Sequence, residues 1–266
     1  MEKLNAQVIN QTYKISAVSY LNTKPFLYGL EHTAIRDEIM ITQDSPALCA
    51  EKLMSNEVDI GLVPVAVIPK LLNPQIVAPF CIGADGNVAT VCLFSAVPME
   101  AIETVYLDYQ SRTSVELVKI LFNEYWNRDV TFVKAFPGYE SEIKGTCAGV
   151  IIGDRAIHFA DKFKYVYDLS KGWKELTGLP FVFAAWVSCR ELDAAFLLRF
   201  REALQFGLDH RTRLLEEYAH LNTAHFTVEN YLFQNLQYEL DAPKQQALEL
   251  FINKLQPEKS VVYCFQ

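Results

Sequence analysis

The first apolar run of the chain reads Tyr13-Lys14-Ile15-Ser16-Ala17-Val18, and the polar loop after it, Ser19-Tyr20-Leu21-Asn22, leads into a helical pattern at 24–31. The same order recurs at 38–42 and 46–56, and again at 58–63 and 65–72. Short apolar runs that alternate with helical periodicity indicate βαβ units. The sequence therefore predicts an α/β protein whose sheet is mostly parallel and has helices on both faces.

A second alternating series predicts a second lobe. Two long strand-like runs, 88–95 and 179–189, enclose shorter elements at 104–107, 114–126, 130–133, 149–152 and 165–167. We interpret the long runs as strands that cross between lobes. This predicts a discontinuous first lobe of residues 1–96 plus 186–266 and a second lobe of residues 97–185, each with a mostly parallel sheet flanked by helices. Ligands of such sheets bind outside the carboxyl ends of the strands, so we expect a ligand cleft between the lobes.

Length and charge limit the possible partners. A chain of 266 residues with 51% hydrophobic composition can bury a large core without disulfides or metals. Its formal net charge of −8, with Lys and Arg scattered singly, argues against nucleic acid and against an anionic membrane surface as partners. An anionic ligand would then depend on local donors such as helix N-termini or one arginine.

The sequence carries no clear targeting or metal signal. Residues 1–14 are polar and no run of about 18 apolar residues occurs, so we expect a cytoplasmic protein without a membrane span. The six cysteines are widely spaced without a CxxC pair, which favours reduced core thiols over a metal site. No HExxH, P-loop, GxGxxG or nucleophile elbow is present, so neither a metal nor a nucleotide is supported.

Two loops that follow predicted strands leave structural and binding interpretations open. In the loop after the first strand, either Asn22 or Thr23 can cap the helix that begins near Pro25, or the loop can carry binding groups. In Gly86-Asn87-Val88-Ala89-Thr90, a turn with positive φ is the favoured interpretation, although the loop lies near the expected hinge.

The strongest local signal is a strand and short loop that lead into a helix, with the sequence Leu107-Asp108-Tyr109-Gln110-Ser111-Arg112-Thr113-Ser114-Val115-Glu116. Thr113 and Glu116 have the spacing of a capping box. A capping box requires neither two further hydroxyls nor an arginine. We therefore interpret the helix start as a carboxylate cradle formed by Ser111, Arg112, Thr113 and Ser114.

Another strand ends at Gly153-Asp154, where Asp154 is expected to cap its own helix and could alternatively position a hydroxyl. The aromatic-rich run at 173–186 is expected to be mainly core and crossing strand. Within it, Phe181 or Phe183 could form a wall of the cleft.

These segments occur in a specific order: Ser19-Tyr20-Leu21-Asn22, Val58-Asp59-Ile60-Gly61-Leu62-Val63, Leu107-Asp108 with Ser111-Arg112-Thr113-Ser114, Ile152-Gly153-Asp154, and Trp173 with Thr177-Gly178-Leu179-Pro180-Phe181. Together, over about 15–190, they resemble the chorismate dehydratases of the futalosine route to menaquinone. One departure is Gly86-Asn87-Val88-Ala89-Thr90, where many relatives have Gly-Pro-Val followed by Arg or a similar residue and then Ser; Thr90 keeps a hydroxyl.

The resemblance implies a type II periplasmic-binding-protein-like fold used for catalysis. It implies a hydro-lyase that converts chorismate to 3-[(1-carboxyvinyl)oxy]benzoate and water without a cofactor. A sister enzyme with the same fold, dihydroxynaphthoate synthase, usually opens with a Ser-Pro-Cys-Pro-Asn-Asp-like loop, whereas this chain has Ser-Tyr-Leu-Asn. A non-catalytic small-anion binding protein is the other alternative, because this fold more often binds than catalyses.

A dicarboxylate substrate divides the expected site into roles. The helix start at 111–114 would hold one carboxylate, and Asn22 would take part in catalysis while Ser19 or Tyr20 orients the ring. No protein base is evident, so the enolpyruvyl carboxylate of the substrate is a candidate base. The remaining substrate contacts are expected at Asn87, Val88, Thr90, Gly153 and Asp154.

Overall fold

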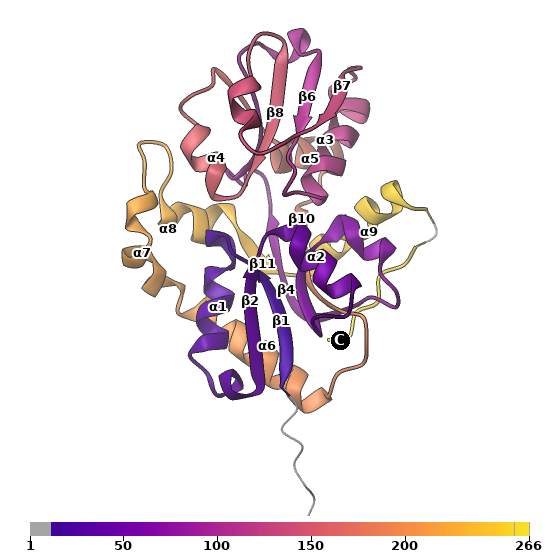
Figure 1. The fold of residues 1–266 in the computed structure, drawn as a ribbon, viewed down its shortest axis with the longest axis vertical. Helices are drawn as coiled ribbons and strands as arrows, with labels where there is room; N and C mark the ends of the chain where they lie inside the picture. Colours follow the sequence, from indigo (N-terminus) through magenta and orange to yellow (C-terminus); the bar gives the residue numbers. More distant parts are fainter. Residues whose placement is uncertain (1–11, 258, 266) are drawn as a thin grey trace, which may run out of the picture.

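The computed structural model describes residues 12–257 and 259–265, which form two lobes stacked along the long axis of the molecule (Figure 1). Each lobe is built around its own β-sheet, with helices packed on it. The predicted α/β fold with two sheets flanked by helices is confirmed. Residues 1–11 lie outside the described residues. They include the start of the expected first lobe and most of the polar stretch at 1–14.

The first lobe holds a six-stranded sheet in the order β11-β4-β10-β3-β1-β2. Its strands are β1 (Tyr13–Val18), β2 (Ile39–Asp44), β3 (Ile60–Pro64), β4 (Gln75–Ala84), β10 (Phe181–Ser188) and β11 (Gln237–Glu239). The helices of this lobe are α1 (Lys24–Glu31), α2 (Pro46–Met54), α6 (Ala194–Asp209), α7 (Leu214–Glu217), α8 (Val228–Asn230) and α9 (Ala242–Leu255).

Helices α1 and α6 cross at very short range because each has a glycine at the crossing. A Cβ atom on Gly29 would lie 1.8 Å from the Ala203 carbonyl oxygen, and one on Gly207 would lie 1.9 Å from the Pro25 carbonyl oxygen. Helix α2 starts after Ser45, whose hydroxyl accepts a hydrogen bond from the Leu48 amide, as expected for an N-cap before proline.

The second lobe holds a five-stranded sheet in the order β7-β6-β8-β5-β9. Its strands are β5 (Val91–Ser95), β6 (Thr104–Leu107), β7 (Thr131–Lys134), β8 (Cys147–Ile152) and β9 (Tyr165–Asp168). Its helices are α3 (Thr113–Glu124), α4 (Asp154–Phe159) and α5 (Leu169–Thr177), and α3 packs against α5.

Both sheets are mixed rather than mostly parallel. β1 pairs in parallel with β2 and β3, but β10 is antiparallel to β3 and β4. In the second sheet β6 pairs in parallel with β7 and β8, but β5 is antiparallel to β8 and β9. Strands β5 and β10 are the first strands after the two crossings, and they are reversed because a chain that enters a lobe from the cleft must run away from it; β11 is antiparallel to β4 and is reversed as well. The carboxyl ends of β1, β3, β4, β6, β8 and β9 therefore all point toward the cleft.

The lobe boundaries differ from those expected at 96/97 and 185/186. β5 hydrogen-bonds only into the second sheet and β10 only into the first, so the chain crosses at 85–90 and between α5 and β10. The expected boundary at 185/186 falls inside β10. Strand-like composition identified both runs, but the sheet to which a strand belongs depends on long-range hydrogen bonds that local composition does not encode.

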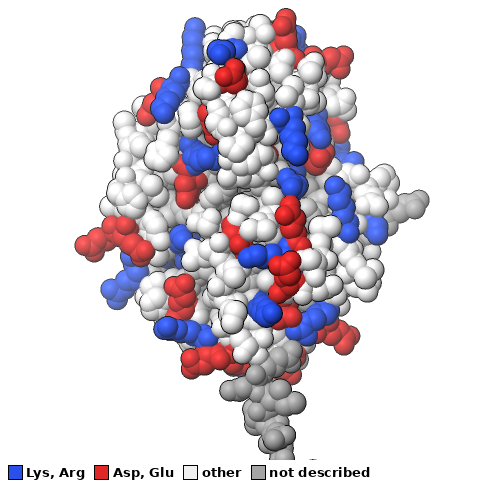
Figure 2. Space-filling view, in the orientation of Figure 1, with Lys and Arg blue, Asp and Glu red and all other residues white. Residues whose placement is uncertain are grey.

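The two lobes share one buried apolar cluster, which includes Leu62 of the first sheet and Leu93 of the second. On the face drawn in Figure 2, acidic and basic side chains are interspersed and no broad area of a single sign is seen. Within the described part of the chain, no helix is long and apolar enough to cross a bilayer. Each of the six cysteines is a free thiol, and burial raises the pKa of Cys49 and of Cys81 to about 12.

Candidate functional site

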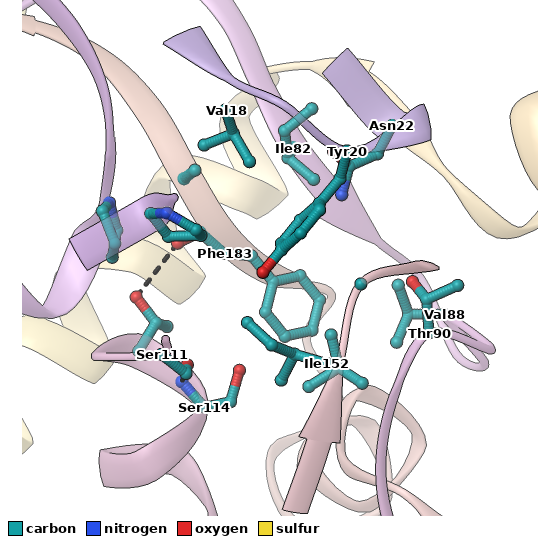
Figure 3. Close-up of a pocket in the computed structure, with 16 residues that line it drawn as sticks. Val18, Tyr20, Asn22, Ile82, Val88, Thr90, Ser111, Ser114, Ile152 and Phe183 are labelled. Carbon is teal, nitrogen blue, oxygen red and sulfur yellow. Dashed lines mark hydrogen bonds between the residues drawn. The ribbon is translucent and has the colours of Figure 1, made fainter. Parts of the chain in front are cut away.

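A pocket lies between the lobes, at the carboxyl ends of strands from both sheets (Figure 3). Its cavity volume is about 60 Å³, much less than the ~300 Å³ or more of ordinary small-molecule sites, so this conformation is too closed for a ligand of that size. The lining residues are Val18, Tyr20, Asn22, Pro46, Pro64, Ile82, Val88, Thr90, Val91, Ser111, Thr113, Ser114, Ile152, Gly153, Phe183 and Ala184.

Tyr20 extends from the loop after β1 into the pocket, as Figure 3 shows. Its hydroxyl donates to Oε1 of Gln110 in the other lobe at 2.5 Å. Its ring lies against Gly153, which has φ of +64°, and a Cβ atom there would approach the ring to 2.7 Å. Gly153 is therefore required both by its backbone conformation and by the position of Tyr20.

Asp154 connects the lobes beside Tyr20. Its carboxylate oxygens accept from the Leu21 amide at 3.1 and 3.2 Å, so it caps the helical turn η1 (Leu21–Thr23) in the opposite lobe. The expectation that Asp154 caps its own helix is wrong, and neither Asn22 nor Thr23 makes a side-chain cap. Burial raises the pKa of Asp154, and the hydrogen bond from Leu21 acts in the opposite direction.

Asn22 lines the pocket one residue further along the loop, and two hydrogen bonds fix it. Its side-chain Oδ1 accepts from the Thr23 hydroxyl at 3.1 Å, and its backbone oxygen accepts from the Tyr238 hydroxyl on β11 at 3.0 Å. Because Oδ1 and the backbone are held, the carboxamide of Asn22 is a positioned group at the edge of the cavity.

The start of α3 forms the opposite wall. The Ser111 hydroxyl accepts from the Ser114 amide at 3.0 Å and so acts as the cap, which makes the predicted Thr113 capping box wrong. The Thr113 hydroxyl instead spans the lobes: it donates to the Phe183 carbonyl at 3.0 Å and accepts from the Ala66 amide at 3.3 Å. The backbone amides of residues 113 and 115 are in the first helical turn, where no intrahelical acceptor exists.

Ser114 differs from its neighbours because its hydroxyl has no hydrogen-bond partner in the described residues. The residue is buried and lines the pocket, and Figure 3 shows its oxygen directed toward the cavity. No backbone acceptor is found among the described residues for the amides of 113 and 115, so these two amides and the Ser114 hydroxyl give the helix start three donors for an anion.

Four residues that the sequence assigned to the site do not line the pocket, and one of them is Asp154, whose carboxylate instead accepts from the Leu21 amide. The Arg112 side chain is 43% exposed and forms an ion pair with Glu51 at 3.5 Å on the surface. Ser19 is exposed, and so is Asn87, whose backbone oxygen accepts from the Asn235 side chain at 2.9 Å. The adjacent residues Val88 and Thr90 do line the pocket, as expected.

No charged side chain lines the cavity over residues 12–257 and 259–265. Within the same ranges no group of three His, Cys, Asp or Glu side chains is arranged to hold a metal ion. The pocket wall instead combines hydroxyl and amide groups with aliphatic and aromatic side chains.

Comparison of the sequence with known proteins shows the family to which the chain belongs. A family model described as menaquinone biosynthesis matches residues 13–257. The chain belongs to this menaquinone-biosynthesis family. It is 29% identical over 269 residues to a chorismate dehydratase of Thermus thermophilus, covering 91% of this chain and 95% of that protein. The family resemblance read from the sequence is therefore confirmed.

Solved structures with low sequence identity show the same fold. A protein of Archaeoglobus fulgidus superposes with a TM-score of 0.72 at 16% identity, covering 92% of this chain and 96% of the other. The periplasmic aliphatic sulphonate binding protein of Escherichia coli gives 0.61 at 14% identity, covering 94% and 95%. The expected periplasmic-binding-protein-like fold is confirmed.

In this member of the menaquinone-biosynthesis family, the site includes residues that sequence reasoning missed. Gln110, which accepts a hydrogen bond from the Tyr20 hydroxyl, lies in the segment 107–116 that gave the strongest local signal. Its side chain has neither a hydroxyl nor a charge, so it was not selected as a site residue. Of the two aromatic residues considered for the cleft wall, Phe183 lines the pocket, whereas Phe181 packs against Trp173 in the core.

The crossing segment at 85–90 is held by a buried carboxylate. The Asp168 oxygen Oδ2 accepts from the amides of Val88 and Ala89 at 2.9 and 2.8 Å, and Ala89 has a φ of +67°. Oδ1 accepts from the amides of Ser170 and Lys171 at the start of α5. Burial raises the pKa of Asp168 to about 6, although these N–H groups oppose the effect.

Proposed function

We propose that this protein is a chorismate dehydratase, a hydro-lyase that converts chorismate to 3-[(1-carboxyvinyl)oxy]benzoate and water. The observation that carries the proposal is the interlobe pocket, in which donors without charge face apolar walls, in a chain 29% identical to a chorismate dehydratase. The substrate class is a small cyclic dicarboxylate.

The reaction requires no oxidant or reductant. The C–H bond of the ether-bearing ring carbon breaks and its electron pair forms a ring double bond. The C–O bond of the neighbouring carbon breaks, and its hydroxide leaves with the released proton as water. Because the product ring is aromatic, the elimination is strongly favoured, and the protein contributes mainly positioning and oriented donors.

Binding of the carboxylates would use the start of α3. Its first-turn amides and the Ser114 hydroxyl would donate to one carboxylate, supported by the positive end of the helix dipole. Phe183 and Ile152 would pack against the ring, since both line the pocket beside these donors. Tyr20 and Asn22, on the opposite lobe, would orient the ring as the lobes close.

No Asp, Glu, His or Lys lines the pocket within the described ranges, and burial raises the pKa of Tyr20, so this phenol keeps its proton and is not a general base. The enolpyruvyl group of chorismate is attached through its ether oxygen to the carbon that loses the proton, so the carboxylate of that group can reach the proton intramolecularly. We assign the base to the substrate, and we assign Asn22 the role of holding the ring and its leaving hydroxyl.

The alternatives are a non-catalytic anion binder and the sister dihydroxynaphthoate synthase. Likeness to a sulphonate binding protein favours the first, but it concerns the fold alone. The Ser-Tyr-Leu-Asn loop, which differs from that of the sister enzyme, argues against the second.

Asn22→Ala and Asn22→Asp variants test the assignment when each is mixed with chorismate and the aromatic enol ether is quantified. We expect both variants to lose about 100-fold or more in kcat relative to the natural protein. Full turnover by either variant would remove Asn22 from the mechanism. Tight chorismate binding without product in the natural protein would favour the non-catalytic alternative.

A further inference from the structure

Tyr231 lies directly behind the pocket and is fully buried. It begins the π-helical turn η8 (Tyr231–Asn235), which follows α8 in the first lobe. Its hydroxyl oxygen lies 2.7 Å from the hydroxyl oxygen of Thr90, a residue that lines the pocket. Single π-helical turns are often found at functional sites, where they redirect a side chain.

The geometry allows either hydroxyl to donate, and we assign Tyr231 as the donor from the chemistry of the two groups. Burial raises the pKa of Tyr231 above its usual range, so the phenol keeps its proton at neutral pH. A phenolic O–H is more acidic than an aliphatic O–H, which makes Tyr231 the better donor and Thr90 the acceptor. The proton of Thr90 is then free, and the Thr90 hydroxyl has no other partner among the residues that the structure describes.

The rest of Thr90 is fixed, so its hydroxyl cannot turn far from the cavity. Its backbone oxygen accepts from the Gly153 amide at 2.9 Å, which ties it to the end of β8 in the second lobe. The open side of Thr90 is the pocket, which it shares with Asn22 (Figure 3).

The same C-terminal segment also supports Asn22 and the crossing segment. Tyr238 donates to the Asn22 backbone oxygen at 3.0 Å, and the Asn235 side chain donates to the Asn87 backbone oxygen at 2.9 Å. The Asn22 side chain lies close enough to Tyr231 to influence its pKa. One short segment, 231–238, thus contacts three residues of the pocket and hinge from behind.

We propose that Tyr231 is a positioning residue for the elimination: by donating to Thr90, it directs the Thr90 proton toward the oxygen of the departing hydroxyl group. This rests on the proposed function. Thr90 only donates a hydrogen bond, which stabilises negative charge as the C–O bond breaks. The proton that completes the water is the one removed from the ring carbon, so the balance of the reaction is unchanged.

A double-mutant cycle with chorismate tests the proposal. Tyr231→Phe removes one hydroxyl and should lower kcat about 10- to 100-fold with KM changed less than about 3-fold, because the lost contribution concerns the transition state. Thr90→Val should lower kcat at least as much. If Tyr231 acts through Thr90, the double variant should be no slower than Thr90→Val alone.

Tyr139→Phe is the matched control. Tyr139 is also fully buried but does not line the pocket, and its hydroxyl lies within hydrogen-bond distance of the Val150 carbonyl and of the Asp108 carboxylate in the second lobe. This variant should lose stability but keep its kcat within about 2-fold.

The outcomes separate the two hypotheses. If the natural protein forms no product from chorismate, the proposed function fails, and the inference fails with it. If the natural protein turns over and Tyr231→Phe keeps full kcat, or the two substitutions are additive, only the inference is overturned. A loss of kcat in Tyr139→Phe equal to that in Tyr231→Phe would likewise overturn it, because the effect would then be a general loss of stability.

Discussion

The two carboxylate oxygens of Asp154 in the second lobe accept hydrogen bonds from the Leu21 amide of the first lobe, at 3.1 and 3.2 Å. The Leu21 amide begins a helical turn that has no side-chain cap of its own. When the lobes separate, this amide loses its acceptor and the carboxylate loses its donor. In this conformation the loop that carries Tyr20 and Asn22 is therefore capped by a carboxylate of the opposite lobe, and we expect closure of the cleft to be coupled to this capping.

Asp154→Ala should raise KM for chorismate by about 10-fold, since hydrogen bonds to charged groups contribute about 1.5–3 kcal/mol and the closed form loses one. Asp154→Asn, which keeps an acceptor oxygen, is the matched variant and should have a smaller effect. Hydrogen exchange at the Leu21 amide, measured without substrate, should become faster in Asp154→Ala. Unchanged exchange would show that this contact does not hold the lobes together.

Gly153→Ala should abolish most activity, because the added Cβ would approach the Tyr20 ring to 2.7 Å at a φ of +64°. Gly138→Ala provides the control for backbone strain: Gly138 has a φ of +88°, but a Cβ added there would meet no atom within 4 Å among the described residues. Its substitution should lower stability by about 1 kcal/mol with activity retained. Equal loss of kcat/KM in the two variants would contradict the role given to Tyr20.

Ser114→Ala should raise KM about 10-fold, because the free hydroxyl of Ser114 is expected to donate to a substrate carboxylate. Arg112→Ala should change KM less than about 2-fold, since this side chain is directed to Glu51 on the surface. Steady-state kinetics of the two variants compares them directly. A larger rise in KM for Arg112→Ala than for Ser114→Ala would indicate that Arg112 binds the carboxylate and would contradict the assignment made from the structure.

Asp168 should make stability pH-dependent. Its pKa is about 6 in the folded protein against 3.8 ordinarily, so the unfolded chain loses this proton first and ionisation favours unfolding. The free energy of unfolding, relative to an Asp168→Asn variant, should therefore fall by about 3 kcal/mol as pH rises from about 4 to about 6 and stay level above that. Urea denaturation of both proteins over this range measures the difference. Parallel curves would rule out the titration.

The fold was largely predictable because hydrophobic periodicity is local. The alternation that begins at β1 identified the α/β class, and strand composition identified β5 and β10. The mixed character of the sheets and the position of the crossings could not be read in this way. They depend on the hydrogen bonds that β10 makes to β3 and β4, strands more than 90 residues earlier in the chain.

The site was predictable only to the level of loops. Loops at strand ends correctly located Tyr20, Asn22, Thr90 and Ser114 at the pocket, but neighbours in the same loops, such as Arg112, face solvent. The direction of a side chain within a loop depends on tertiary contacts. For the same reason, the partner of Asp154 in the opposite lobe, and Tyr231 behind Thr90, could not be inferred from spacing.

The central claim is most directly tested by incubating the purified natural protein with chorismate and following the product by absorbance and mass. The account predicts catalytic formation of an aromatic enol ether that is lighter than chorismate by one water, without added oxidant or reductant. Saturable binding of chorismate with no such product over many hours would contradict it and leave a protein that binds anions without converting them.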